Sequence, residues 1–399
     1  MTEASMKNAP IASSLPVYTR VDLTFERGEG AWLWDTTGRR YLDFGSGIAG
    51  TGLGHCHPHL VKTLQAQAAR LWHVSNLFRI EQYERLADRL VAHSFADTVF
   101  VCNSGAEAIE ASVKMARRYH HHRGRPERNR IVTFEGAFHG RTMTGISATN
   151  APKMIDGFAP LLDGFDIVPF ADLDAARAAI GEHTGAIMIE PIQGEGGIRP
   201  APFEYLRQLR ELCDEQGLLL VLDEVQCGMG RTGTMWVHEQ AGIRPDIMAV
   251  AKGLGGGFPI GACLATAEAA SGMVAGTHGS TFGGNPLACA VADAVLDVML
   301  APGFLSHVQA MGELLREHVE ALAARHPEKI AEVRGRGLLL GLRTVEPCAD
   351  FVAAARETGL ILVPASDNVA RLLPPLTVTA AEIGQAVEML AEVCGREPA

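Results

Sequence analysis

The 399-residue chain is long enough to fold into two or three ordinary domains with a large buried core. Hydrophobic residues make up 47% of it and charged residues 20%, a composition that excludes a largely disordered protein. The formal net charge of -11, with no block rich in lysine and arginine to offset it, argues against nonspecific binding to nucleic acid or to anionic lipid.

The cysteines and the N-terminal segment bear on where the protein works. Eight cysteines are scattered without a CxxC pair, which is typical of free thiols in a reducing compartment. The opening segment, MTEASMKNAPIASS, is polar, and no run of about eighteen apolar residues follows it. We therefore expect a cytoplasmic protein without a membrane segment.

The order of apolar runs predicts an α/β fold. Before residue 45 we expect short strands, with D-T-T-G as a hairpin turn. From about residue 60 to about residue 290, strand-like runs alternate with helical patterns, which predicts a mostly parallel sheet with helices on both faces. Four runs have the nearly continuous aliphatic character of buried parallel strands: Thr98 to Cys102, Arg130 to Phe134, Ala186 to Glu190, and Leu218 to Asp223.

The C-terminal part has a different pattern. After about residue 290 we expect a long helical stretch, three strand-like pieces (GLLLGLR, GLILVPA and VARLLPP) and a last helix from about Thr379. We therefore predict a large domain over 60–290 and a smaller α+β domain built from 1–59 together with 291–399.

Polar side chains follow the predicted strands. Ligands of open α/β sheets bind beyond the carboxyl ends of the strands, so we expect Ser104, Glu190, Asp223 and Lys252 to face one crevice. This convergence is the main structural prediction from the sequence.

The segment V-C-N-S-G-A-E-A predicts a helix that begins after Ser104, with Glu107 in the capping-box position. The free amides of such a helix start bind anions, and Gly105 lets a phosphate approach the backbone. Taken alone, the pattern is more typical of a plain capped helix.

Asp223 and Lys252 are candidates for chemistry. Asp223 ends an apolar strand and needs a positive partner, which a protonated pyridine nitrogen or an ordinary salt bridge or helix cap would supply. Lys252 precedes the loop G-L-G-G-G-F-P-I-G, and its amine is able to form an imine and to move a proton. An isolated lysine is usually a solvated surface charge, and the loop matches neither of the glycine-rich nucleotide motifs.

Further candidates are weaker. In E-G-A-F-H-G-R, at 135–141, Phe138 is able to cover a flat ring and Arg141 to clamp a carboxylate. The histidines of H-C-H-P-H, at 55–59, and of H-H-H, at 120–122, lack the spacing of a zinc site, so we predict no metal.

Together, these segments resemble the class III branch of the fold-type-I pyridoxal-phosphate aminotransferases. Over nearly the whole chain, the resemblance rests on G-H-C-H-P, S-G-A-E-A, F-H-G-R, E-P-I-Q-G-E-G-G, D-E-V-Q-C-G-M-G-R-T-G, A-K-G-L-G-G-G-F-P-I-G-A and H-G-S-T-F-G-G-N-P. It implies a seven-stranded, mostly parallel sheet, pyridoxal 5'-phosphate as cofactor, and a homodimer with shared active sites.

The resemblance also implies roles for single residues. Lys252 is similar to the catalytic lysine that binds the cofactor as a Schiff base, and Asp223 to the partner of its pyridine nitrogen. The other cofactor-binding positions are Gly105 and Ala106 at the phosphate, Phe138 on the ring, Gln226 near the phenolic oxygen, and Thr281 at the phosphate of the neighbouring subunit's cofactor.

Within the family, the compact length and R-L-L-P-P-L-T-V-T resemble the branch that acts on N-acetylornithine and 2-oxoglutarate in arginine biosynthesis. In that branch Arg141 and Ser280 would contact the acylornithine, and Arg371 would hold a substrate carboxylate. Glu195 would pair with Arg371 and swing away for 2-oxoglutarate. Ile48 stands where ornithine aminotransferases carry a tyrosine, which argues against free ornithine as the donor.

The expected products are N-acetylglutamate 5-semialdehyde and L-glutamate. Succinylornithine, ornithine and 4-aminobutyrate stay open as donors, and an aminomutase or a decarboxylase would use the same cofactor residues. Two further alternatives are a nicotinamide-dependent oxidoreductase, which rests on the glycine-rich loop alone, and a noncatalytic binding protein.

Overall fold

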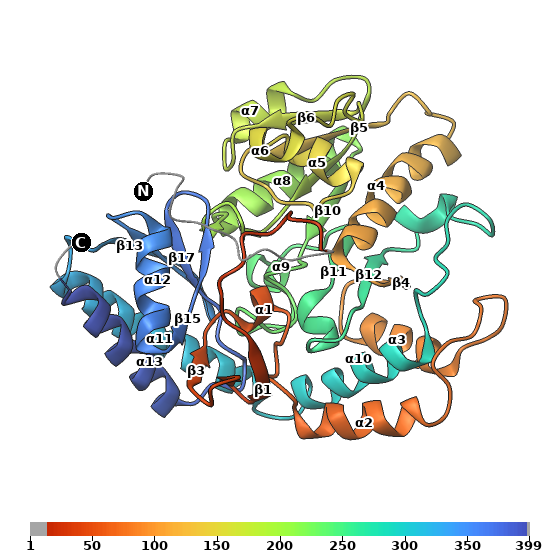
Figure 1. The fold of residues 1–399 in the computed structure, drawn as a ribbon. Helices are drawn as coiled ribbons and strands as arrows, with labels where there is room; N and C mark the ends of the chain where they lie inside the picture. The colour runs from red at the N-terminus through yellow and green to blue at the C-terminus, as the bar shows by residue number, and fades with distance from the viewer. Residues whose placement is uncertain (1–13, 397–399) are drawn as a thin grey trace.

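The protein has a larger lobe and a smaller lobe, with the N-terminal strands between them (Figure 1). The computed structural model describes residues 14–396. Most of the polar segment that opens the chain therefore lies outside the described residues.

A seven-stranded sheet forms the centre of the larger lobe, in the order β4-β12-β11-β10-β7-β5-β6. Its strands are β4 (Thr98–Cys102), β5 (Arg130–Phe134), β6 (Phe165–Val168), β7 (Thr184–Ile189), β10 (Leu219–Asp223), β11 (Ile247–Val250) and β12 (Gly261–Ala265). Neighbours from β11 to β6 are parallel, and β12 runs antiparallel to both β11 and β4. The predicted mostly parallel α/β sheet is confirmed.

The prediction that Thr98–Cys102 is a buried parallel strand is wrong. β4 is the edge strand of the sheet, pairs with β12 in antiparallel register, and begins with an exposed residue. Aliphatic composition indicates burial and not the direction of the neighbouring strand. Two antiparallel pairings in succession nevertheless leave β4 running in the direction of β10, so both strands end at the same edge of the sheet.

Alternation along β10 divides the core of the larger lobe into two layers. Leu219 and Val221 pack with helix α4, whereas Leu220 and Leu222 lie in the core on the opposite face with α8 and α10. Each fully buried leucine stabilises the fold by about 1.5–3 kcal/mol. The helices of this lobe are α2 (Pro58–Ala68), α3 (Glu81–Ala92), α4 (Gly105–His122), α5 (Met143–Thr149), α6 (Pro152–Ile155), α7 (Leu173–Ala178), α8 (Phe203–Gln216), α9 (Val237–Ala241) and α10 (Pro286–Met299).

The smaller lobe is an antiparallel sheet with helices packed on it. The sheet has the order β13-β14-β17-β16, with β13 (Ile330–Arg336), β14 (Leu339–Thr344), β16 (Val363–Ala365) and β17 (Val369–Leu372). Its helices are α11 (Phe304–Arg325), α12 (Cys348–Thr358) and α13 (Ala380–Cys394). β13 and α12 were not predicted, because β13 is mostly polar and half-exposed and α12 is short and rich in alanine.

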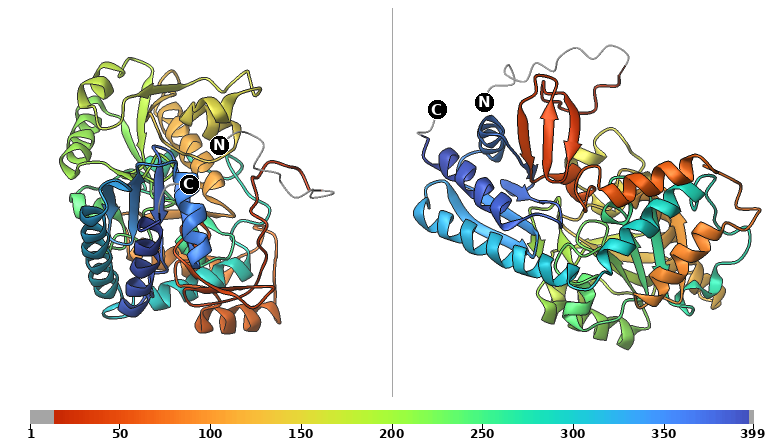
Figure 2. Two further views of the ribbon diagram at one scale, coloured as in Figure 1. Left: turned by 60° about the vertical axis from the view of Figure 1, so that its left-hand side comes forward. Right: turned by 90° about the horizontal axis from the view of Figure 1, so that it is seen from below.

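The two ends of the chain meet in one sheet. The strands β1 (Phe25–Glu29), β2 (Trp32–Asp35) and β3 (Arg40–Asp43) form antiparallel pairs, and β15 (Leu360–Ile361) adds to β3 in parallel. The N-terminal strands lie beside the C-terminal helices (Figure 2). Helix α10 runs across the predicted boundary at residue 290 and packs against α2 and α3, and the division at 59 and 290 stays a prediction.

Among residues 14–396, no single helix is both long and apolar enough to span a membrane. Helices α10 and α11 pass that test only as a pair, by length and composition, and they are bent by 73° at their junction.

Candidate active site

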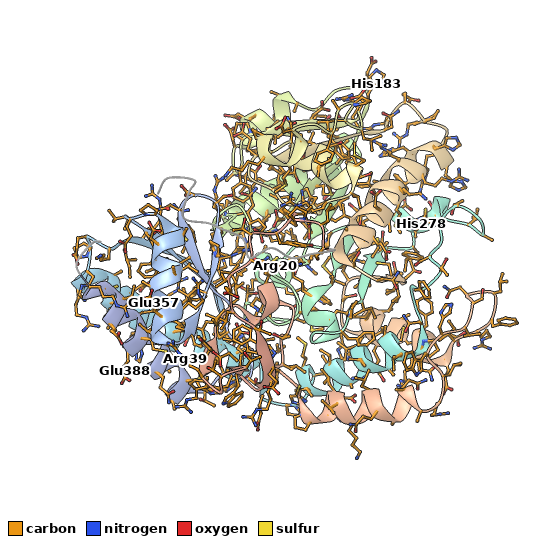
Figure 3. The ribbon with its side chains drawn as sticks, in the orientation of Figure 1. Arg20, Arg39, His183, His278, Glu357 and Glu388 are labelled. Carbon is orange, nitrogen blue, oxygen red and sulfur yellow. The ribbon has the colours of Figure 1, made fainter. Side chains whose placement is uncertain are left out.

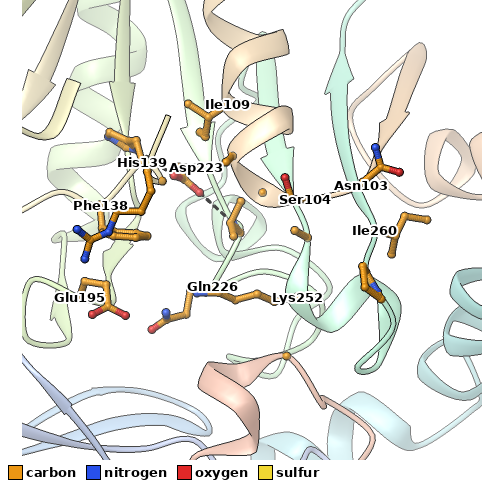
Figure 4. Close-up of a pocket in the computed structure, with 18 of the residues that line it drawn as sticks. Asn103, Ser104, Ile109, Phe138, His139, Glu195, Asp223, Gln226, Lys252 and Ile260 are labelled. Atoms are coloured by element: carbon orange, nitrogen blue, oxygen red, sulfur yellow. Dashed lines mark hydrogen bonds and ion pairs between the residues drawn. The ribbon is translucent and has the colours of Figure 1, made fainter. Parts of the chain in front are cut away.

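The segments that follow β4, β5, β7, β10 and β11 surround a cavity of about 430 Å³ (Figure 4). Ser104, Glu190, Asp223 and Lys252, the four polar strand ends expected to face one crevice, all line it. Other predicted site residues among its lining are Gly105, Ala106, Phe138, Arg141, Glu195 and Gln226. Ser280, Thr281 and Arg371 do not line it.

Helix α4 points its N-terminus at the cavity. Ser104 caps the helix, because its Oγ accepts a hydrogen bond of 3.2 Å from the backbone N–H of Glu107. The predicted capping box is only half formed, since the Glu107 carboxylate accepts from the N–H of Asn103, at 2.5 Å, and not from that of Ser104. A Cβ on Gly105 would lie 2.8 Å from Val225 Cγ1, so only glycine fits here. The first amides of α4 therefore face the cavity without a side chain in front of them.

Asp223 finds its positive partner in His139. Asp223 Oδ2 lies 2.8 Å from His139 Nδ1, and its Oδ1 accepts from the N–H of Val225 at 3.0 Å. Because a carboxylate only accepts, Nδ1 of the histidine carries the proton. Burial opposes the charged imidazole, but the hydrogen bond and the charge of Asp223 outweigh it and raise the pKa of His139. No role was predicted for this histidine, although it stands in the F-H-G-R motif.

Glu190 is a second buried carboxylate of the cavity. It is 6% exposed, and burial, followed by the negative charge of Asp223, raises its pKa to about 7. Its Oε1 accepts from the N–H of Phe138 at 2.7 Å and its Oε2 from the N–H of Gly194 at 3.2 Å. Two carboxylates with different environments therefore lie side by side at this edge of the sheet.

Lys252 lies where β11 ends, in a 3-10 turn over Lys252–Gly255. Its φ of +43° places it in the left-handed region, which residues other than glycine seldom adopt. Burial lowers the pKa of its amine, and the Arg371 charge acts in the same direction. A larger fraction of Lys252 is thus neutral and nucleophilic than for a lysine in water.

An ion pair between a buried arginine and a half-buried glutamate adjoins the cavity. Arg371, on β17, is 1% exposed and donates to Glu195 Oε1 at 2.7 Å and to Gln226 Oε1 at 3.4 Å. A third bond goes to the carbonyl of Pro364 at 3.0 Å. Because Glu195 and Gln226 line the cavity, they separate Arg371 from it. Movement of Glu195 would free a guanidinium for an incoming carboxylate.

Phe138 and Arg141 lie together on the loop after β5. The Phe138 ring lines the cavity, and the exposed Arg141 places its guanidinium carbon 5.7 Å from the ring centroid. Ser280 Oγ instead accepts from Asn103 Nδ2 at 3.1 Å, next to the cavity lining, and Thr281 is exposed. Ile48 is 40% exposed, with φ at +60°, in the short turn α1 (Ser46–Ala49) that precedes the cavity residue Gly50.

Three histidines of the two runs have ordinary partners. His55 pairs with Asp43 at 2.7 Å, His59 with Asp297 at 2.9 Å, and His120 with the carbonyl of Gly185 at 2.8 Å. Over the described residues 14–396, no group of three His, Cys, Asp or Glu side chains is placed to hold a metal ion.

Residues 16–394 match the family described as Aminotransferase class-III. The chain belongs to the class-III aminotransferases. It is 59% identical over 380 residues to a curated acetylornithine aminotransferase of Rhodobacter capsulatus, and the match covers 95% of this chain and 97% of that one.

Solved class-III relatives share the fold. An N-acetylornithine aminotransferase from Stenotrophomonas maltophilia is 39% identical, with a TM-score of 0.82 over 93% of this chain and 95% of that one. An ornithine aminotransferase from Toxoplasma gondii, which holds pyridoxal phosphate at its active site, is 32% identical, with a TM-score of 0.91 over 96% and 92%. This class-III aminotransferase is therefore a transaminase, and its family implies pyridoxal phosphate as the cofactor.

The cavity fits that cofactor by its donor set. An anionic group suits the open amides at the start of α4, and a flat ring suits the face of Phe138. A ring nitrogen that carries a proton suits Asp223, and an aldehyde suits the Lys252 amine. All four groups line one cavity, as a single bound molecule requires.

Proposed function

We propose that this class-III aminotransferase transfers the δ-amino group of N2-acetyl-L-ornithine to 2-oxoglutarate. The products are N-acetylglutamate 5-semialdehyde and L-glutamate, which places the reaction in arginine biosynthesis. The observation that carries the proposal is the ion pair of the buried Arg371 with Glu195, beside a cavity that Lys252 lines. The 59% identity to an acetylornithine aminotransferase supports the choice of donor.

Four groups would hold the cofactor. Gly105 and Ala106 offer backbone amides to the phosphate, Phe138 covers the ring and Asp223 pairs with its nitrogen. Gln226 would lie near the phenolic oxygen. Bound pyridoxal phosphate supplies the electron sink that lets an amino group leave one carbon skeleton and join another.

The protein's own groups bind and orient the substrates. Lys252 holds and returns the proton at the reacting carbon, and its lowered pKa keeps the amine ready for that work. His139 donates to Asp223 and thereby orients that carboxylate. Arg141 and Ser280 would contact the acylornithine.

Two substrates alternate in one pocket. With the amino donor, Glu195 neutralises Arg371 at 2.7 Å. With 2-oxoglutarate, Glu195 moves aside and Arg371 binds one of the two carboxylates of this substrate through its planar fork. A pocket of this kind accepts in turn a substrate without a carboxylate next to the reacting carbon and one that has it.

We also propose a homodimer with shared active sites. The loop after α2 is tied to the loop before α10, because Asn76 Nδ2 donates to the carbonyls of Ser280 at 3.1 Å and Gly283 at 2.9 Å. Both loops expose large apolar side chains, namely Leu71, Trp72, Leu77, Phe78 and Phe282. Thr281 lies in this exposed surface, and His278 of the same loop lies at the outer side of α4 (Figure 3). An apolar surface of this kind marks an interface, and a second copy of the chain would bring Thr281 to the partner's cofactor phosphate.

The cytoplasm is the proposed site of action. All eight cysteines are free thiols, and burial raises the pKa of those at 102, 213, 227, 263, 289, 348 and 394. Such buried thiols are inert and suit a reducing compartment.

The test compares four amino donors with 2-oxoglutarate as acceptor: N-acetylornithine, N-succinylornithine, ornithine and 4-aminobutyrate. We expect the highest kcat/KM with N-acetylornithine. A clear preference for ornithine or 4-aminobutyrate would refute the donor and leave the cofactor site intact. Product analysis without 2-oxoglutarate separates transamination from mutase or decarboxylase chemistry, since only the latter two turn over without an acceptor.

A further inference from the structure

Glu190 connects two segments that are far apart in the sequence. It follows β7 and lines the cavity, with 6% of its surface exposed. One oxygen accepts from the N–H of Phe138 at 2.7 Å, and the other accepts from the N–H of Gly194 at 3.2 Å. A single carboxylate thus fixes the backbone of the loop after β5 and of the turn after β8 (Ile192–Gln193).

Each of these segments presents a site residue to the cavity. The first places the Phe138 ring, and the second leads directly into Glu195, the partner of Arg371. The Gly194 backbone is also confined from the other side, because a Cβ there would lie 2.1 Å from Gln226 Oε1. The Gly194 backbone, which precedes Glu195, therefore donates to Glu190 and packs closely against Gln226, and the position of Glu195 depends on both contacts.

A carboxylate is the side chain that this arrangement needs. Both of its oxygens accept, so it satisfies two N–H donors at once, whereas an amide of the same length presents one acceptor and one NH2 donor. The group is costly here, since burial and the neighbouring Asp223 both oppose its ionised form. Nothing in apolar packing calls for a carboxylate at this strand end.

We propose that Glu190 is a positioning residue. It holds the Phe138 ring and the Glu195 carboxylate, which covers Arg371, in a fixed position relative to each other across the cavity. The inference rests on the proposed roles of those two residues in the transamination. It adds a residue that acts through its neighbours and need not touch the substrate.

The chain offers a matched control in Glu224. This carboxylate follows β10, is 0% exposed, and accepts from the N–H groups of Val237 at 2.8 Å and His238 at 3.0 Å. It also pairs with His238 Nδ1 at 3.0 Å, and it does not line the cavity. Glu190→Gln and Glu224→Gln thus each replace a carboxylate that accepts from two backbone N–H groups at a buried strand end, and only Glu190 lines the cavity.

The first measurement is backbone amide hydrogen exchange in the cofactor-free protein. In Glu190→Gln we expect exchange at Phe138 or at Gly194 to become roughly tenfold faster, since the N–H that faces the NH2 group of the glutamine loses its acceptor. In Glu224→Gln the faster exchange should be confined to the segment around Val237. Wild-type exchange at both Phe138 and Gly194 in Glu190→Gln would overturn the proposal. This result needs no substrate, so it is independent of whether N-acetylornithine is the donor.

The second measurement uses the enzyme loaded with pyridoxal phosphate. We expect Glu190→Gln to reduce the circular dichroism of the bound cofactor and to raise KM for 2-oxoglutarate roughly fivefold, with both values unchanged in Glu224→Gln. The same changes in both variants at an equal loss of thermal midpoint would make the role merely structural and overturn the proposal. If Glu190→Gln does not fold, Glu190→Asp replaces it, since the shorter carboxylate cannot reach both N–H groups and should speed exchange at one of them.

Discussion

At the scale of single residues, Lys252 gains its reactivity from its surroundings. It lies two residues after the end of β11, in a left-handed conformation, and burial lowers the pKa of its amine below the ordinary 10.5. The neutral amine is the form that adds to an aldehyde. Since a lowered pKa releases the proton at lower pH, a larger fraction of the amine is neutral at a given pH than for an ordinary lysine.

We therefore predict a pH dependence for the recombination of the cofactor-free protein with pyridoxal phosphate. The rate should rise with pH and reach half of its maximum at a lower pH than for an ordinary lysine. Stopped-flow absorbance measures this rate, and Nα-acetyl-lysine in the same buffers serves as the reference. A half-maximal rate at the same pH as for the reference, or at a higher one, would contradict the assignment.

Arg371 carries a second prediction at this scale. A lysine there keeps the charge but loses the planar fork that reaches Glu195, Gln226 and the Pro364 carbonyl together. We expect Arg371→Lys to lower kcat/KM for 2-oxoglutarate roughly 10- to 100-fold, or about 1.4–2.8 kcal/mol. The control is Arg334→Lys. Arg334 forms an ion pair with Asp367 at 2.6 Å and does not line the cavity. This substitution should change kcat/KM by less than about twofold. Equal effects in the two variants would argue against a role for Arg371 in binding.

At the scale of elements, four strands of the large sheet followed from the sequence. The predicted Leu218 to Asp223 became Leu219–Asp223, because a continuous aliphatic run is buried on both faces wherever it lies in a parallel sheet. The antiparallel direction of β12 was not predicted, because amino-acid composition does not indicate the direction of a strand. The contacts of His139 with Asp223 and of the Phe138 N–H with Glu190 were found only in the structure, because these partners lie 84 and 52 residues apart along the chain.

The N-cap of α4 is the element feature most directly tied to the site. Ser104→Ala removes the hydroxyl that accepts from Glu107, and we expect it to lower the free energy of unfolding by about 1 kcal/mol and to weaken cofactor binding. Thr379→Ala removes the equivalent cap of α13, whose Oγ accepts from Glu382 at the same 3.2 Å, away from the cavity. Urea unfolding and cofactor titration compare the two variants. Equal loss of cofactor affinity in both would mean that the start of α4 has no special part in binding.

At the scale of the whole molecule, the proposed homodimer would complete each site with a residue of the second copy. If Thr281 serves the partner's site, each site takes Lys252 from one chain and Thr281 from the other. Lys252→Ala and Thr281→Ala therefore remove contributions that come from different chains. A dimer that combines one chain of each kind then has one site with both residues intact. The exposed apolar loops that carry Thr281 are where such a pairing would form.

Mixing the two inactive variants tests this arrangement. After subunit exchange at equal amounts, about half of the dimers are mixed and each has one intact site of two, so activity should return to about a quarter of the wild-type value. The assay uses limiting pyridoxal phosphate, where the phosphate contact matters most. No recovery, with exchange verified by native mass spectrometry, would place Thr281 in its own chain's site or outside any site.

The central claim is that Lys252 is the residue that binds pyridoxal phosphate, and one measurement tests it most directly. The purified enzyme is reduced with borohydride, digested, and its peptides are analysed by mass spectrometry. The account predicts a single pyridoxyl group on the peptide that contains Lys252, and its absence after treatment with N-acetylornithine, which converts the cofactor to its free amine form. An unmodified Lys252, or a pyridoxyl group on another lysine, would contradict it.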